Sequence, residues 1–279
     1  MPRTIDAFRG THFRVVFIMP FTMRNHALEA VESYYHKILP FYEEENEQRD
    51  DLEFWRDMVA RQKPQFVLEL GAGSGRVTAE LADLAPVVAL DLSVEMLQRA
   101  STRLAVRSTD ALFKPTLVAA DMRRFAFARR FDLILAPNDP FSHLTRNRER
   151  QIALRAIARH MAPGGKLVIE GLYRSKRKRV EVPEHCIGTV SVRELWVPIG
   201  RDHCWRAHYF YRRGEKHVDA QFVARSWSLC DLNTLFTRCG LELEEIWGDF
   251  DGRPFTPDAE RIILMARPSP SRPRRARIA

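Results

Sequence analysis

The apolar residues of this chain gather in short runs, separated by longer segments in which apolar residues recur at helical spacing. A short, nearly uncharged run of this kind is typical of a strand that is buried on both faces of a parallel sheet. The runs occupy residues 67–70, 87–91, 117–122, 131–136 and 162–169. Helix-forming sequence lies between them, so their order predicts an α/β fold in which a mostly parallel sheet carries helices on both faces.

The segment before the first run has helical spacing. Residues 26–37 and 43–61 are expected to form two helices, and Pro40 between them predicts a break. Residues 1–26 form an N-terminal extension of unknown role. An extra packing strand, a disordered arm and a misassigned start codon are all open interpretations of this extension.

A different pattern follows the fifth run. Residues 172–226 leave the α/β rhythm, and within them residues 189–192 and 205–211 alternate between apolar and polar positions. Such alternation indicates the strands of an antiparallel sheet. We therefore expect an antiparallel β insertion directly after the fifth strand.

The helical rhythm returns near the carboxyl end of the chain. Ser228 begins a capping-box pattern, and the helix it starts is expected to end at Gly240. Residues 241–247 and 261–266 read as two further strands, and residues 248–252 resemble a hairpin turn. The aspartates of this turn are assigned no chemistry.

The first apolar run ends in three alternating glycines, Gly71, Gly73 and Gly75, with Glu69 two residues ahead of them. Glycine permits positive φ and lets a ligand approach bare backbone, so the segment predicts a ligand over a tight turn from strand to helix. A tight turn without a ligand is the simpler alternative. The glycine spacing differs from that of the nicotinamide fingerprint. Glu69 would repel a pyrophosphate but suits a ligand that carries ammonium and sulfonium charge, which favours S-adenosyl-L-methionine.

Acidic residues end the next two runs. Asp91 lies 20 residues after Gly71, a separation at which a carboxylate of a Rossmann-like unit accepts both ribose hydroxyls. Asp121 and Met122 end the third run. Both aspartates could instead cap the helices that follow them. Met96 lies on the helix after Asp91, where packing explains it as well as an adenine contact does, so it is left outside the predicted site.

Together these segments resemble the class I S-adenosylmethionine-dependent methyltransferases. The glycine segment resembles motif I of that family, and Asp121 and Met122 stand where the family contacts the adenine amino group and ring. The resemblance covers roughly residues 28–266. It implies a Rossmann-like sheet of seven strands, S-adenosyl-L-methionine as cofactor, and Glu69, the three glycines and Asp91 as further cofactor-binding residues.

The resemblance also divides the chain. It implies a methyltransferase domain of residues 27–266, preceded by residues 1–26 and followed by a basic, disordered tail of residues 267–279. Within the domain, residues 172–226 stand where the family keeps its specificity elements. The insertion is therefore predicted to be a lid or a substrate platform.

Candidate catalytic residues follow the fourth strand. A sulfonium is already activated, so the protein has mainly to align a nucleophile and remove one proton. Residues 137–144 resemble the Ser-x-x-His-Leu type segment of small-molecule N-methyltransferases, including those for nucleotide-linked amino sugars, although Ser142 directly precedes His143 here. By this resemblance His143 faces the reacting amine and accepts or orients its proton. A structural histidine that caps the next helix is the alternative.

A second candidate lies in the first helix. Tyr34 and Tyr35 resemble the Tyr-Tyr-Asp segment that folds over the cofactor in the family, although His36 replaces the acid. Tyr35 is predicted to contact the cofactor carboxylate or the substrate. Burial in a helix interface is the competing interpretation.

The formal net charge is +8, and four arginines of the tail account for half of it. A proline-rich basic end is most simply solvated and disordered. The other basic cluster, residues 174–179, begins near the carboxyl end of the fifth strand, where α/β sheets bind ligands. It could attract a phosphate-bearing or carboxylate substrate or RNA, or it could be a solvated loop.

The remaining composition narrows the class of protein. Four scattered cysteines form no disulfide framework, which favours a reducing, cytoplasmic location. The pairs His185-Cys186 and His203-Cys204 are unlikely zinc ligands, because adjacent strand residues point to opposite faces, and no metal is expected. No apolar run reaches the roughly 20 residues that span a bilayer, so no membrane partner is expected.

The sequence therefore predicts methyl transfer from S-adenosyl-L-methionine to a small, anionic or nucleotide-linked acceptor, most simply at nitrogen. An RNA or protein methyltransferase is the first alternative, motivated by the basic clusters but weakened by the lack of a recognisable RNA-binding module. A cofactor-binding regulatory paralogue without chemistry is the second, because fold does not fix function. The oligomeric state is not predicted.

Overall fold

A computed structural model describes residues 15–17, 26–107 and 112–270 of the chain. The central sheet has eight strands in the order β1-β4-β3-β2-β5-β6-β12-β11. Neighbouring strands pair in parallel from β1 to β6, and β12 pairs antiparallel with both β6 and β11. Its strands are β1 (Val15–Phe17), β2 (Val67–Leu70), β3 (Val87–Asp91), β4 (Thr116–Ala119), β5 (Phe131–Ala136), β6 (Met161–Leu172), β11 (Leu241–Trp247) and β12 (Arg261–Pro268). The seven predicted strands are all present, and the predicted α/β fold is confirmed.

The eighth strand, β1, comes from the N-terminal extension and pairs parallel to β4 at the sheet edge. Of the open interpretations of residues 1–26, the extra packing strand therefore applies to these three residues. Residues 1–14 and 18–25 lie outside the described part of the chain, as do residues 271–279 of the predicted tail. The predicted start of that tail at residue 267 is wrong, because Arg267 and Pro268 pair with β11 as the last residues of β12.

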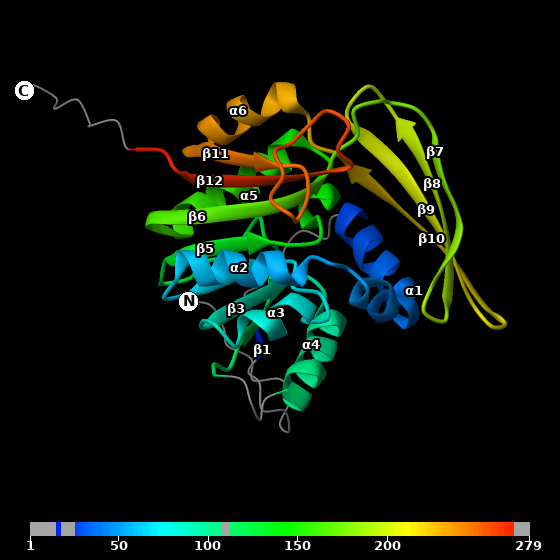
Figure 1. Cartoon of the computed structure of the whole chain (residues 1–279), viewed down its shortest axis with the longest axis horizontal. Helices are drawn as coiled ribbons and strands as arrows, with labels where there is room; N and C mark the ends of the chain where they lie inside the picture. Colours follow the sequence, from blue (N-terminus) through cyan, green and yellow to red (C-terminus); the bar gives the residue numbers. More distant parts are fainter. Residues whose placement is uncertain (1–14, 18–25, 108–111, 271–279) are drawn as a thin grey trace, which may run out of the picture.

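Helices cover both faces of this sheet (Figure 1). One face packs against α2 (Leu52–Gln62), α3 (Arg76–Leu81) and α4 (Val94–Arg107), and the other packs against α5 (Asn147–His160) and α6 (Leu229–Arg238). Alternate residues of each strand enter the two layers: Val67 belongs to the first core and Leu68 to the second. Because the strands are buried on both faces, they appear in the sequence as nearly continuous apolar runs.

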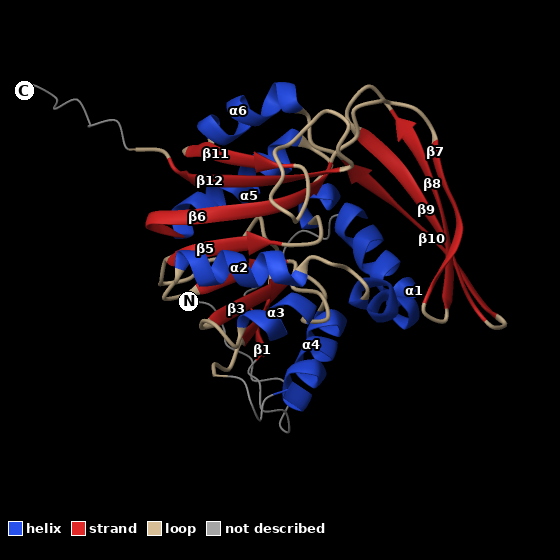
Figure 2. Ribbon diagram, in the orientation of Figure 1, coloured by secondary structure: helices blue, strands red, loops and turns tan. Residues whose placement is uncertain are grey.

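The insertion is a separate antiparallel sheet of four strands in the order β10-β9-β8-β7 (Figure 2). It contains β7 (Val180–Ile187), β8 (Val190–Ile199), β9 (Cys204–Arg213) and β10 (Lys216–Arg225). The predicted strands correspond to parts of β8 and β9, whereas β7 and β10 were not predicted individually. Helix α1 (His26–Glu47) lies between the two sheets and packs its Tyr34, Ile38 and Phe41 against the insertion.

The predicted break at Pro40 is wrong. Helix α1 continues through Pro40 to Glu47, and the chain leaves helical structure only before α2 begins at Leu52. Pro40 is exposed, while its helix neighbours Ile38, Leu39 and Phe41 are buried. Tertiary packing on both sides of the proline therefore outweighs the hydrogen bond that its ring removes.

The last predicted helix is present with one difference at its start. Helix α6 has Ser228 at its N-cap, but the Ser228 side chain makes no capping hydrogen bond. Its end agrees with the prediction, since Gly240 follows in the left-handed conformation with φ of +79°. Within the described residues, no helix is long and apolar enough to cross a membrane.

Candidate active site

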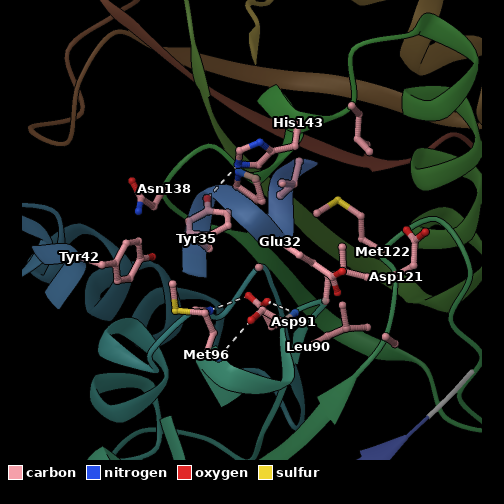
Figure 3. A pocket seen from close by; sticks show the side chains of 18 residues that line it. Glu32, Tyr35, Tyr42, Leu90, Asp91, Met96, Asp121, Met122, Asn138 and His143 are labelled. Carbon is pink, nitrogen blue, oxygen red and sulfur yellow. Dashed lines mark hydrogen bonds between the residues drawn. The ribbon is translucent and has the colours of Figure 1, made fainter. Parts of the chain in front are cut away.

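A cavity opens at the carboxyl ends of the parallel strands, beneath helix α1 (Figure 3). Seven of the nine predicted site residues line it: Tyr35, Gly71, Gly73, Asp91, Asp121, Met122 and His143. They come from α1, the turn after β2, the last residue of β3, the turn after β4 and the short 3-10 helix η1 (Pro140–His143). The carboxyl ends of the parallel strands lie at the same end of the sheet, so these side chains come together there.

The glycine turn is fixed by backbone geometry as well as by space. Gly71, Gly73 and Gly75 have φ of +73°, +55° and +77°, a region that side chains other than glycine rarely adopt. A methyl group on Gly71 would lie 2.7 Å from Pro140 Cβ, and one on Gly73 would lie 2.8 Å from the Tyr42 hydroxyl. The turn therefore stays narrow and leaves bare backbone facing the cavity.

Asp91 organises this turn. Its Oδ2 accepts a hydrogen bond from the Gly73 N–H at 2.8 Å, and its Oδ1 accepts one from the Ser93 N–H at 2.8 Å. Burial raises the pKa of Asp91, and these backbone donors oppose the rise. A carboxylate held in this way at the cavity wall is suited to accept hydroxyl groups, as predicted for the ribose.

The adenine end of the predicted site is lined by Asp121, Met122 and Met96. Asp121 is paired with Arg123, whose Nη2 lies 2.7 Å from its Oδ2. Met96 is buried and nevertheless lines the cavity, so the sequence argument missed it as a site residue. Its position on the helix after Asp91 was the only signal, and that signal could not separate packing from ligand contact.

Glu69 and Gly75 do not line the cavity. Glu69 is 2% exposed, and its Oε2 accepts a hydrogen bond from the Thr78 hydroxyl at 2.6 Å. Burial raises the pKa of Glu69 to about 8. In this structure Glu69 is therefore a buried residue that binds Thr78 of the helix after the glycine turn, and its contact with the cofactor stays a prediction.

Tyr35 and His143, predicted independently from distant segments, meet in the cavity (Figure 3). The Tyr35 hydroxyl and His143 Nε2 lie 2.9 Å apart and share a hydrogen bond. His143 Nδ1 is buried and has no hydrogen-bond partner among the described residues. When Nε2–H donates to Tyr35, Nδ1 carries a free lone pair that can accept a proton from another molecule.

Burial lowers the pKa of His143 to about 4. The imidazole is therefore neutral throughout the physiological pH range, unlike an exposed histidine, which titrates near neutrality. Burial also raises the pKa of Tyr35 well above its usual value, so its hydroxyl stays protonated. Both side chains of the pair are therefore neutral, and either can donate the hydrogen bond that joins them.

The rest of the Tyr-Tyr-His segment faces elsewhere. Tyr34 packs on Phe222 of β10 with ring centroids 4.5 Å apart, so it belongs to the interface with the insertion. His36 is exposed and lies 2.9 Å from Glu95 of α4. Of the three residues, only Tyr35 enters the cavity.

The loop after β5 contains two further cavity-related features that sequence reasoning missed. Asn138 and Asp139 both adopt left-handed φ, of +57° and +54°, although neither is glycine. Asn138 lines the cavity, and its backbone N–H donates to Glu170 Oε2 at 2.6 Å. Asparagine and aspartate are the residues other than glycine that most readily adopt this conformation, so the Asn138-Asp139 pair was a weak signal that the sequence analysis did not use.

Comparisons with known proteins show similarity to methyltransferases in sequence and in fold. Residues 67–165 match the model of a methyltransferase domain family. The chain is 32% identical over 211 residues to the dTDP-3-amino-3,4,6-trideoxy-alpha-D-glucopyranose N,N-dimethyltransferase of Streptomyces venezuelae, covering 71% of this chain and 84% of that protein. It is 25% identical over 214 residues to the cypemycin N-terminal methyltransferase of a Streptomyces species, covering 71% and 81%. The solved structure of the CcbJ methyltransferase from Streptomyces caelestis has the same fold, with a TM-score of 0.72 at 22% identity over 80% of this chain and 91% of that one.

The chain belongs to the class I S-adenosylmethionine-dependent methyltransferases. The cavity fits that cofactor, since it combines a glycine turn without side chains, the Asp91 carboxylate predicted to accept the ribose hydroxyls, and apolar side chains beside Asp121 where adenine is predicted to bind. When bound, S-adenosyl-L-methionine supplies an activated methyl group. The protein's own residues must bind it, orient the acceptor beside it and exclude water.

Proposed function

We propose that this methyltransferase acts on a small acceptor that carries an anionic or nucleotide-linked group, and that it transfers the methyl group to nitrogen. The observation that supports this proposal is the neutral Tyr35–His143 pair in the cavity, with one ring nitrogen of His143 unpaired. A base with a pKa of about 4 is too weak to ionise a hydroxyl group. An amine that binds as the free base already has its lone pair and needs only to be oriented.

The aromatic surroundings of His143 fit a small acceptor. Its ring lies 5.3 Å from the Phe222 ring of β10 and 5.5 Å from the Tyr35 ring of α1. The insertion and α1 thus form walls on two sides of the histidine, as expected of a substrate platform. The relative from Streptomyces venezuelae is named for an N,N-dimethyltransferase of a nucleotide-linked amino sugar, which agrees with this acceptor class.

A peptide or RNA acceptor is the second candidate. The cypemycin relative is named for methylation of a peptide N-terminus, which favours a peptide over RNA. The basic segment that motivated an RNA substrate is partly used within the protein: Arg177 donates to the carbonyl oxygen of Gly200 at 2.7 Å, and Arg179 pairs with Glu181 at 3.1 Å.

The test is methyl transfer to matched acceptors. The protein is incubated with S-adenosyl-L-methionine and either a thymidine diphosphate amino sugar or the same nucleotide sugar with a hydroxyl group in place of the amine. We expect S-adenosylhomocysteine and an N-methylated product with the amine alone. Faster methylation of the hydroxyl compound, of a peptide or of RNA would overturn the proposal, and no turnover with any acceptor would favour the regulatory paralogue.

A further inference from the structure

The basic segment after β6 separates into arginines that face the surface and one that does not. Arg177 is exposed and bonds to backbone carbonyls of the turn between β8 and β9, and Arg179 is exposed and paired with Glu181. Lys176 and Lys178 are exposed as well. Arg174, by contrast, is half-buried against the inner face of the insertion.

Arg174 has the surroundings of an anion-binding arginine. Its guanidinium carbon lies 4.6 Å from the centroid of the Trp196 ring and 5.4 Å from that of Trp205. Aromatic faces of this kind hold a guanidinium in place while its N–H groups remain available to an oxyanion. Arg174 Nε is buried and has no hydrogen-bond partner among the described residues. A buried donor without a partner is rare in proteins and often marks a group that a ligand completes.

Among the described residues, no direct ion pair neutralises the charge of Arg174. No carboxylate of the described residues lies within ion-pair distance of it, although Glu194 and Glu260 are near enough to act on it through space. The Glu194 carboxylate already accepts a hydrogen bond from Trp196 Nε1 at 2.8 Å. Burial is the largest influence on Arg174 and lowers its pKa. A bound anion would therefore replace the solvation that burial removes from this guanidinium.

A continuous series of ring contacts connects Arg174 to the catalytic histidine. The His143 ring lies 5.3 Å from Phe222, the Phe222 ring lies 6.1 Å from Trp196, and Arg174 stacks on that same tryptophan. Phe222 and Trp196 lie on the inner face of the insertion, where Phe222 contacts His143 of η1 and Tyr34 of α1. The arrangement suits a molecule with its amine at His143 and a negative group further along the insertion.

We propose that Arg174, held by Trp196 and Trp205, is the subsite for the anionic group of the acceptor, either a phosphate or a carboxylate. This inference rests on the proposed function, because it assigns the polar end of the same acceptor. Bidentate recognition by the guanidinium fork makes Arg174 a specificity residue for an acceptor that carries both an amine and an anion. The other basic residues of the segment have no part in it.

The experiment measures anion binding rather than methyl transfer, so its outcome is independent of the acceptor atom. The protein saturated with S-adenosylhomocysteine is titrated by calorimetry with thymidine diphosphate and, separately, with acetate. We expect saturable binding of one of them: thymidine diphosphate identifies a phosphate subsite, and acetate identifies a carboxylate subsite. Arg174→Met should weaken that binding at least tenfold, and Arg174→Lys should restore only part of it because lysine lacks the fork.

Arg179→Met is the matched control, since it removes an exposed arginine of the same segment and should leave anion affinity unchanged. Retained S-adenosylhomocysteine affinity in each variant verifies that the cofactor domain is folded. Equal anion affinity in wild type and both Arg174 variants would overturn the proposal, as would an equal loss in Arg179→Met. Absence of saturable binding of both anions to the wild type up to millimolar concentration would overturn it too, whether or not N-methylation is observed.

Discussion

At the scale of single residues, Asp91 carries the clearest prediction for cofactor binding. It faces the cavity while it also holds the Gly73 and Ser93 backbone N–H groups. Asp91→Ala removes a charged hydrogen-bond acceptor and should weaken binding of S-adenosyl-L-methionine by about 1.5 to 3 kcal/mol. Isothermal titration calorimetry measures this change, and unchanged affinity in a folded Asp91→Ala variant would contradict the ribose assignment.

His143 should affect turnover and not cofactor affinity. His143→Ala removes the side chain that orients the acceptor, so we expect turnover to fall by about 10²-fold, the cost of a misplaced reacting group. Affinity for S-adenosylhomocysteine should barely change, because Asp91, Asp121 and Met122 come from other strands. Near-normal turnover in the folded variant would make His143 a structural residue.

The low pKa of His143 makes a separate prediction about pH. Because the imidazole is protonated only below a pH of about 4, turnover at saturating acceptor should show no histidine limb between pH 6 and 8. A rise in that range should follow the pKa of the acceptor amine and shift when an amine of different basicity is used. A limb that stays near pH 6.5 with every acceptor would contradict the neutral imidazole.

Residues whose role follows from local geometry were the predictable ones. The alternating glycines required positive φ, and Asp91 and Asp121 ended apolar strands, so the sequence sufficed to bring them to one site. The left-handed Asn138 and Asp139 were signalled only weakly, by residue types that tolerate this conformation, because distant residues make the hydrogen bonds that hold Asn138. The Glu170 carboxylate that binds the Asn138 N–H lies on another strand.

At the scale of elements, tertiary contacts decide what local sequence leaves open. Pro40 predicted a helix break, yet α1 runs through it because its apolar stripe packs against the insertion. Strand β7 was missed because Glu184 interrupts the alternation of Val180, Val182 and Cys186, and its pairing with β8 supplies the order that its own pattern does not specify. Strand β10, which pairs with β9, alternates regularly from Val218 to Ala224 and was predictable from its own sequence.

Helix α1 is joined to the loop after β5, and the segment after α1 is joined to β6, by one polar contact each. Asn138 Nδ2 donates to Asn46 Oδ1 at 2.9 Å, and Arg49 Nη2 donates to Glu170 Oε1 at 2.6 Å. Glu170 is 5% exposed, so its ion pair is desolvated far more than a surface pair. These contacts fix the position of the element that covers the cavity.

Glu170→Gln should therefore lower the free energy of unfolding by about 2 kcal/mol, between the values for exposed and fully buried ion pairs. It should also weaken S-adenosylhomocysteine binding, since Asn138 lines the cavity. Urea unfolding and calorimetry measure the two effects. Glu181→Gln, which removes an exposed partner of Arg179 and Arg193, is the control and should cost less than about 1 kcal/mol. Equal losses in both variants would contradict the role given to Glu170.

At the scale of the whole molecule, the protein buries several acids around its cavity and its insertion interface. Burial raises the pKa of Glu69 and Asp139 to about 8 and that of Glu45 to about 7. The ordinary pKa values of these carboxyls lie near 4, so the folded protein holds protons near neutral pH that the unfolded chain releases. Together these three acids therefore make the free energy of unfolding depend on pH in one direction.

Because folding takes up protons between about pH 4.5 and 8, the free energy of unfolding should fall as pH rises through this window. The contribution of His143 to stability changes with pH in the opposite direction, since its lowered pKa removes stability as pH falls from about 6.5 to 4. The buried acids therefore dominate the pH dependence above pH 6.5.

Glu69→Gln preserves an acceptor for the Thr78 hydroxyl and removes the titrating group. It should therefore reduce the slope between pH 6.5 and 8 by about 1 kcal/mol per pH unit, measured by urea unfolding at several pH values. Glu245→Gln, which removes an exposed carboxyl on β11, should leave the slope unchanged. A Glu69→Gln variant with the wild-type slope would mean that the buried Glu69 is already ionised in the folded protein, and the glycine turn would then rest on a charge rather than on a neutral hydrogen bond.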